Sequence, residues 1–450
     1  MENINNDYKE KSLILNNKEL KICYNEVLIN GERAERNILK PLIKIKDYKD
    51  LDKKLPTLNT ITIKEKDLNY YINNGFVIIK YDKYYAIECR NTYMLDKLEY
   101  EKSQFASNIS FTENINNNLY LIRNRIKSSK LKSVSLDMGS LTNTRCIILY
   151  IDGITEEKLV KKIYKRLKSI KIDGIFDSCY LKDYLNKFSI FPTITSTLRP
   201  DKASSMLLEG KIVIISDNSN SAIVLPNIFI DFFHTMDDYY SSYILSSFIR
   251  IIRLISFFIS VYLPSIYMLS IKENYTFLNK EFVKIIRKSC NGTIFNIFFQ
   301  IIFLIIIFNI LRESDLHKSE NGSATFSLLG GLVLGSSAVF SKIVSPISLI
   351  VISLSTISNL VFDSYEFQNT LNILKLFVVV MSYIFNTNGF IISIILIFIV
   401  IVTTKSFNKN YFYPFIPFDK KSFIDSILRI KVHNKYRNKI FTKNIKRGRI

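Results

Sequence analysis

The sequence contains few of the side chains that bind metals or form disulfide frameworks. It has three histidines and five cysteines among its 450 residues. The histidines lie far apart along the chain, which argues against a histidine-based metal site. The cysteines are scattered, odd in number and include no Cys-x-x-Cys pair, so we expect free thiols in a reducing compartment. We predict neither a metal site nor a bound cofactor.

Short motifs of the common enzyme classes are absent as well. There is no phosphate-binding Gly-Lys-Ser/Thr loop, no His-Glu-x-x-His motif and no Gly-x-Ser-x-Gly nucleophile turn. No two acidic residues are marked out by position as an acid–base pair. We therefore expect a protein that is not an enzyme. A membrane-anchored enzyme is an alternative, and it requires a polar catalytic cluster in the first 240 residues.

Hydropathy divides the chain into two unlike halves. Residues 1–240 are polar, with 37 Lys/Arg against 31 Asp/Glu, whereas apolar runs dominate from residue 243 to 404. The runs are 243–270, 293–311, 326–362, 371–383 and 389–404. The third run has 37 residues and fits two helices with a turn at 341–346, and the last two runs are separated by Asn386-Thr387-Asn388. We expect an α-helical transmembrane bundle of five or six helices.

The two ends of the chain favour the same side of the membrane. Residues 1–13, MENINNDYKEKSL, contain no apolar run of the kind found in a signal peptide. The tail after the last apolar run has 13 Lys/Arg against 2 Asp/Glu, as the positive-inside rule expects of a cytoplasmic segment. We expect both termini in the cytoplasm and therefore an even number of spans, six. The loop 271–292 argues against this topology, because it has five Lys/Arg against two Glu and six spans would place it outside the cytoplasm.

The basic tail has two possible partners. A cluster of lysines and arginines can bind nucleic acid, but this one adjoins a membrane segment, where anionic lipid headgroups suffice. We expect membrane lipids as partners and no nucleic acid.

The polar half has the patterning of a soluble α/β N-terminal region with two small subdomains. Residues 71–88 predict strand–turn–strand, and a helix is expected at 114–126. Further on, 145–151 and 211–216 predict strands, and 155–170 predicts an amphipathic helix with Thr155 as its N-cap. We predict α/β subdomains at 1–129 and 130–240, a transmembrane helical domain at 241–404 and a basic cytoplasmic tail at 405–450.

The end of the polar half carries a series of ordered motifs. They are Arg199-Pro200-Asp201, Leu207-Leu208-Glu209-Gly210, the strand-ending Asp217 and Asp238-Tyr239-Tyr240. In order and spacing they resemble the GerA spore germination protein family, specifically the germinant receptor A subunit. Further similar segments are 171–185, 257–267, 330–335 and 343–347, so the resemblance covers roughly 111–418.

The resemblance implies a function that composition does not show. The family's members would sit in the spore inner membrane as multi-pass proteins and take part in nutrient sensing. The A subunit would form a homo-oligomer, work with germinant receptor B and C subunits, and act in signal transduction or as the ion channel whose opening releases ions. Ile305 and Asn309 stand where the family has acidic residues, which leaves an ion-handling role of that span open. A membrane transporter of a small solute or ion is the alternative function, but such transporters have internal repeats, and the sequence shows none.

Four residues of the motifs are candidates for ligand or subunit contacts: Arg199, Asp201, Glu209 and Asp217. The alternative reading is purely structural. Because the residue before a proline is driven out of the helical region, Asp201 would cap a helix over 202–209 that ends at Gly210.

Two further groups of candidates lie at and inside the membrane. Asp238, Tyr239, Arg250 and Arg253 are coupling candidates. Along one continuous helix Asp238 and Arg250 would be about 18 Å apart, so we expect them to pair between neighbouring subunits. The alternative is that the arginine side chains snorkel to the lipid headgroups. We expect the Lys375 side chain to snorkel in the same way. Ser327, Gly331, Gly335 and Pro346 are helix-packing or pore candidates, because small residues every four positions let helices approach closely or line a pore.

Overall fold

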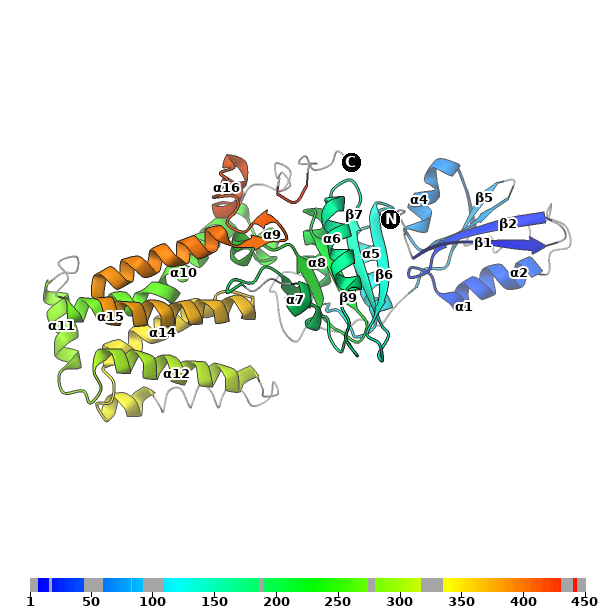
Figure 1. Ribbon diagram of the computed structural model, residues 1–450. Helices are drawn as coiled ribbons and strands as arrows, with labels where there is room; N and C mark the ends of the chain where they lie inside the picture. The colour runs from blue at the N-terminus through cyan, green and yellow to red at the C-terminus, as the bar shows by residue number, and fades with distance from the viewer. Residues whose placement is uncertain are drawn as a thin grey trace.

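The computed structural model describes residues 7–15, 18–43, 60–81, 83–91, 109–185, 189–273, 280–316, 335–429 and 440–442. These residues form two α/β units and a helical domain, which lie in a row (Figure 1). The second α/β unit is in the middle and contacts the helical domain. The predicted fold class, an α/β N-terminal region followed by a bundle of apolar helices, is confirmed.

The first unit is an antiparallel sheet covered on both faces. Its strands, in the order β1-β2-β4-β5-β3, are β1 (Tyr8–Leu15), β2 (Lys18–Asn25), β4 (Phe76–Lys80), β5 (Tyr84–Glu88) and β3 (Thr60–Ile63). The predicted strand–turn–strand at 71–88 is the β4–β5 hairpin. Val77 and Ile79 pack with Leu42 of α2 (Lys40–Ile43), whereas Ile78 packs with Ile72 of α4 (Leu68–Ile72). Successive β4 side chains thus serve two cores, as the period-2 geometry of a strand requires.

The second unit is also an antiparallel sheet with helices on both faces. Its strands, in the order β6-β7-β9-β10-β8, are β6 (Leu131–Met138), β7 (Thr144–Ile151), β9 (Ile212–Ser216), β10 (Ala222–Leu225) and β8 (Thr195–Thr197). One face packs on α5 (Ile115–Arg125) and α8 (Pro200–Leu208), and the other packs on α6 (Glu157–Lys168) and α7 (Tyr180–Leu185). The central strands β7 and β9 are buried on both faces, which explains their continuous apolar runs.

Two helices of this unit differ from their predicted form. The helix predicted at 114–126 exists as α5, but its apolar face packs on the second sheet, so α5 lies with the second unit rather than with residues 1–129. Thr155 is not the N-cap of α6. That position is Glu156, because the Thr155 hydroxyl instead accepts a hydrogen bond from the Ile151 amide (3.2 Å) and closes the turn after β7.

Three described helices are long and apolar enough to cross a membrane. They are α10 (Tyr243–Lys272), α12 (Ile297–Leu316) and α15 (Tyr365–Thr403); a fourth apolar helix, α14 (Pro346–Leu360), is shorter. The turn predicted at 341–346 is confirmed: Lys342 has a positive φ of 56°, and Ser345 caps α14, with Pro346 in its first turn. The number of crossings stays a prediction.

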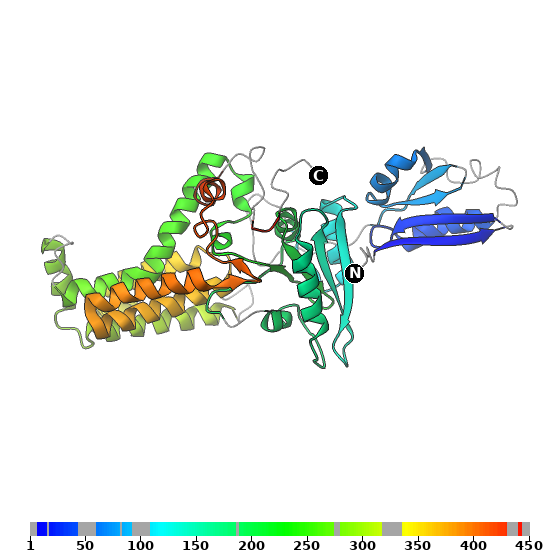
Figure 2. The ribbon, with the colours of Figure 1, turned by 45° about the horizontal axis from the view of Figure 1, so that its top comes forward.

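The helix α15 is a hairpin of two apolar segments. Asn386 has φ 55° and ψ −139°, which no α-helix accommodates. Phe367 and Ile401 belong to one buried cluster, although a straight helix would separate them by about 50 Å. The chain therefore reverses at Asn386, as the Asn-Thr-Asn signal predicts, and returns to the α/β side (Figures 1 and 2).

Polar side chains inside the bundle are enclosed by neighbouring helices. Lys375 was expected to extend to the headgroups, but it is only 1% exposed. Its segment of α15 packs between other helices, so the side chain has no route along the outside of the bundle. Of the small-residue stripe, the structure describes Gly335. This glycine faces Leu349 of α14, and a Cβ atom at position 335 would lie 3.4 Å from the leucine Cδ2. Ser327 and Gly331 lie outside the described residues.

A candidate coupling site where the two domains meet

The junction between the domains is built on a sharp break in the chain. The short helix α9 (Asp237–Tyr240) ends at Ser241, which has the extended backbone angles φ −96° and ψ 174°. Ser242 then caps α10, and its hydroxyl accepts the Leu245 amide. Serine at an N-cap satisfies one of the amides that a helix start leaves without a partner. The two helices are therefore separate, and α9 folds back beside the first turns of α10.

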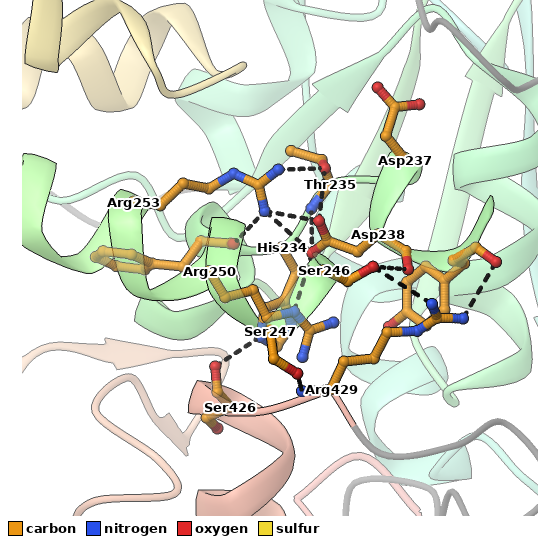
Figure 3. A network of polar contacts seen from close by, with 12 residues as sticks. His234, Thr235, Asp237, Asp238, Ser246, Ser247, Arg250, Arg253, Ser426 and Arg429 are labelled. Carbon is orange, nitrogen blue, oxygen red and sulfur yellow. Dashed lines mark hydrogen bonds and ion pairs between the residues drawn. The ribbon is translucent and has the colours of Figure 1, made fainter. Parts of the chain in front are cut away.

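This break brings Asp238 onto two arginines of the same chain. Arg250 donates from Nε to Asp238 Oδ2 (3.0 Å), and Arg253 donates from Nη1 to both carboxylate oxygens (2.8 and 3.0 Å; Figure 3). All three side chains are at least 90% buried. The expected pairing between neighbouring subunits is not what the structure shows: the pair forms within one chain, because α9 and α10 are not one continuous helix. The arginines do not snorkel.

The loop before α9 completes the cage around Arg253. Its Nη2 donates to the Thr235 hydroxyl (2.8 Å), and its Nη1 also donates to the Phe233 carbonyl (3.1 Å). The same Thr235 hydroxyl donates to Asp238 (3.2 Å). Hydrogen bonds to a charged group are stronger than neutral ones, and a buried charge requires them. Arg253 thus connects α10 to the segment that leaves the second sheet.

The C-terminal segment supplies the other wall of the junction. Arg429 donates to the carbonyls of Tyr239 (3.2 Å) and Ser241, which close α9, and its own amide donates to the Ser247 hydroxyl (3.0 Å). Arg250 also donates from Nη1 to the carbonyl of Asp425 (2.6 Å) in α16 (Lys420–Ile427). A cation at the carbonyl end of a helix is favourably placed. Arginines from α10 and from the tail therefore hold α9 from two sides.

The tail is anchored on the second unit before it reaches the junction. Ser406 donates to the Thr193 carbonyl (2.9 Å), and the buried Tyr411 donates to the Pro192 carbonyl (3.2 Å). The carbonyl of Tyr411 accepts the Phe229 amide (3.0 Å). The described part of the tail is thus a folded component of the interface between the domains.

The Arg-Pro-Asp motif lies one helix away from this junction. Arg199 and Asp201 form a two-point ion pair, with Nη2–Oδ2 at 2.7 Å and Nε–Oδ1 at 3.1 Å. The prediction that Asp201 is the N-cap of this helix is wrong. Helix α8 begins one residue earlier, at Pro200, because proline suits the first helical position. Arg199 is therefore the N-cap residue. Gly210, with φ 96°, follows the helix end as predicted.

Tyr240 joins this ion pair to α9. Burial and the negative charge of the Asp201 carboxylate raise the pKa of the Tyr240 phenol above its ordinary value. Tyr240 of α9 thus lies within the electrostatic influence of the ion pair at the start of α8, and α9 contacts α10 through Asp238.

The two remaining motif residues lie in different surroundings. Asp217 accepts the Ile115 amide (3.1 Å) at the start of α5, so its carboxylate supplements the N-cap residue Asn114. Glu209 lines a cleft of about 90 Å³ between α8, the loop before α9 and the tail, together with Lys202, His234, Lys421 and Asp425. The four motif candidates therefore do not converge on one site.

Comparison with known proteins identifies the chain's relatives. The family described as Bacillus/Clostridium GerA spore germination protein matches residues 1–440. The chain belongs to this GerA family. Spore germination protein GerQA of Bacillus cereus is 30% identical over 98% of this chain and 91% of its own length. Spore germination protein A1 of Bacillus subtilis (strain 168) is 28% identical over 95% of this chain and 91% of its own length.

A solved structure also resembles part of this GerA family member. The crystal structure of the N-terminal domain of the A subunit of the Bacillus megaterium spore germinant receptor GerK3 has 26% sequence identity and a TM-score of 0.38. It covers 50% of this chain and 89% of that domain.

Sequence reasoning found part of this GerA junction and missed the rest. It singled out Asp238, Arg250 and Arg253 but not Thr235 or Arg429. The Ser241-Ser242 pair, a helix N-cap signal immediately before an apolar run, would have indicated the break. No local signal marks Arg429, because its contacts with Tyr239 and Ser241 span 190 and 188 residues of sequence.

Proposed function

We propose that this chain is the subunit of a spore germinant receptor that transmits nutrient detection to the membrane domain and thereby starts ion release. Membership of the GerA family supports a role in spore germination. The contact of Asp238 with Arg250 and Arg253 carries the proposal of transmission, since it is a buried ionic link between the α/β region and the first apolar helix. The proposed setting is the spore inner membrane, with further receptor subunits as partners.

The buried link is suited to transmission because it resists partial displacement. Removing one member of a buried charge pair leaves its partner unsatisfied and costs several kcal/mol, so the two helices move together or the network rearranges as a whole. A change in the position of α8 would reach α9 through Tyr240 and then α10 through Asp238. Signal transmission through this network would require a second arrangement in which Asp238 exchanges its partners, since a switching element needs two discrete states.

A germination dose–response tests this proposal. Spores carrying Arg253→Gln or Arg253→Lys are compared with the parent at matched protein levels, with Lys161→Gln, a change at an exposed residue of α6, as the control. Glutamine removes the charge, and lysine cannot reproduce contacts with Asp238, Thr235 and Phe233 at once. We expect both variants at Arg253, but not the control, to shift the germinant concentration needed for half-maximal ion release. Overlapping curves for all four strains would refute transmission through this site.

A further inference from the structure

Helix α7 and the turn before it present a row of exposed aromatic side chains that the contacts at the domain junction do not use. Phe176, Tyr180 and Tyr184 follow one another at intervals of four residues and are 67%, 50% and 50% exposed. The rings of Phe176 and Tyr180 contact each other edge to face, with centroids 6.1 Å apart. We call these three residues the α7 aromatic row. Single exposed apolar residues are common on protein surfaces, but an ordered row of three large rings indicates a partner.

The α7 aromatic row is held rigidly in place. The opposite face of α7 carries Leu181 and Leu185, which are 0% and 1% exposed and belong to the core beneath the second sheet. Arg166 of α6 donates to the Leu185 carbonyl (2.9 Å) at the end of the helix. The row cannot turn inward without exposing this leucine face. Its exposure is therefore a fixed property of the fold.

Two contacts place α7 at the level where the apolar helices begin. Lys182 of α7 forms an ion pair with Glu366 in the first turn of α15. After α7, the carbonyl of Ile190 accepts a hydrogen bond from the Thr370 hydroxyl of α15 (2.9 Å). Both views show α7 at the end of the second unit that faces the helical domain (Figures 1 and 2). The row thus lies beside the end of the bundle, not at the distant side of the α/β region.

The apolar surface of the bundle continues toward this level. Tyr365 at the start of α15 is 42% exposed, and Ile373 and Phe377 further along the helix are also exposed. Aromatic side chains are enriched where the hydrocarbon of a bilayer meets its headgroups, because their rings are apolar and the tyrosine hydroxyl stays hydrated. Such residues stabilise a peripheral element by inserting at this boundary.

We propose that the α7 aromatic row inserts into the headgroup–hydrocarbon boundary of the bilayer that holds the helical domain. The second α/β unit is then attached to the membrane at two points, the chain connection at α10 and the lipid contact at α7. The inference requires that the helical domain is embedded in a bilayer but is independent of the proposed signal transmission. Loss of germination signalling in a variant at Arg253 would leave it unaffected.

The chain offers a direct test because it contains no tryptophan. Full-length chains with the single change Tyr180→Trp or Tyr184→Trp are reconstituted in vesicles of phosphatidylethanolamine and phosphatidylglycerol, with and without lipids brominated near the top of the acyl chain. Tyr70→Trp is the matched solvent control, because Tyr70 is 66% exposed on α4 of the first unit. Phe398→Trp, on an exposed apolar position of α15, reports contact with lipid.

We expect blue-shifted emission and loss of emission in brominated lipid for Tyr180→Trp and Tyr184→Trp, as for Phe398→Trp, and neither effect for Tyr70→Trp. Emission from both α7 reporters that matches Tyr70→Trp would overturn the proposal. The proposal would also be overturned by a blue shift that occurs without quenching and that varies with the ratio of protein to lipid. In that case the row would contact a second copy of the chain. All four positions are exposed, and Phe176→Trp provides a further reporter if one variant fails to fold.

Discussion

Asp238 and Arg253 lie fifteen residues apart in the sequence, yet Arg253 Nη1 is 2.8 and 3.0 Å from the two oxygens of the Asp238 carboxylate. A continuous helix would place the two residues more than four turns apart. The contact therefore exists only because the chain breaks at Ser241. Ionic contacts can therefore set the orientation of α9 relative to α10. A displacement of α8 can change that orientation.

Removing the carboxylate at the centre of the junction should destabilise the whole interface. In Asp238→Asn, Arg250 and Arg253 lose their shared anion while remaining buried, for which we expect a loss of about 3 to 5 kcal/mol. Thermal unfolding of the purified chain in detergent or nanodiscs measures this change. Asp237→Asn is the control, since the Asp237 side chain points away from both arginines (Figure 3). Equal unfolding temperatures for the two variants would contradict the assignment.

Arg429 should determine how firmly the tail is held at the junction. In Arg429→Gln the carbonyls of Tyr239 and Ser241 lose their cationic donor, so we expect faster amide hydrogen exchange in α16 and over 239–247. Mass spectrometry of exchanged peptides checks this, with Lys420→Gln, an exposed residue of the same helix, as the control. Unchanged exchange in both segments would show that the tail is held by its apolar contacts alone.

Gly335 should tolerate a methyl group but not a large side chain. A Cβ at this position meets the Leu349 methyl at 3.4 Å, an ordinary contact distance, so we expect Gly335→Ala to assemble normally. Gly335→Leu overfills the space between the helices, at a cost of about 1 to 3 kcal/mol. Recovery of folded chain by size-exclusion chromatography separates the two variants. Normal recovery of Gly335→Leu would mean that α14 shifts to make room.

The buried ion pair between the first α/β unit and the second should weaken at low pH. Burial alone would raise the pKa of Asp7, but the Arg123 guanidinium and hydrogen bonds from Ser133 and Asn25 outweigh it and hold the pKa below its ordinary value of 3.8. A depressed folded pKa gives stability that is present above the unfolded pKa and is lost as the pH falls through the folded value. We expect the unfolding temperature to fall below about pH 4 for this reason.

Asp7→Asn isolates this contribution. The variant should be less stable than the parent at neutral pH, because Arg123 is buried and loses its anion. Its stability should also change less between neutral pH and pH 3 than that of the parent. Glu26→Gln, at a partly exposed ion pair with Lys9, serves as the control. Identical pH profiles of parent and Asp7→Asn would refute the assignment.

Local patterns predicted much of the fold and less of the site. Apolar runs identified β7, β9 and the long helices because burial of these residues is set by their own sequence, and Asn386 marked the reversal in α15. The junction was misjudged for a physical reason. A straight helix was assumed through Ser241, and this assumption moved the partner of Asp238 to another subunit. The role of Arg429 depends on the path by which the helical bundle returns the chain to α9. The pattern of neighbouring residues in the sequence does not encode this path.

The position of Arg429 has a consequence for the order in which the chain is made. During synthesis the α/β units emerge first and each contains its own core, so they are free to fold before any apolar helix exists. Arg429 and the residues of α16 follow only after both segments of α15 have been made and the chain has returned to the α/β side. Among the described residues, the contacts that complete the junction are therefore made late, after both α/β units and the described apolar helices. A chain that stops short of α16 would contain all the sheets and apolar helices that the structure describes and still lack the contacts of Arg429 with the end of α9.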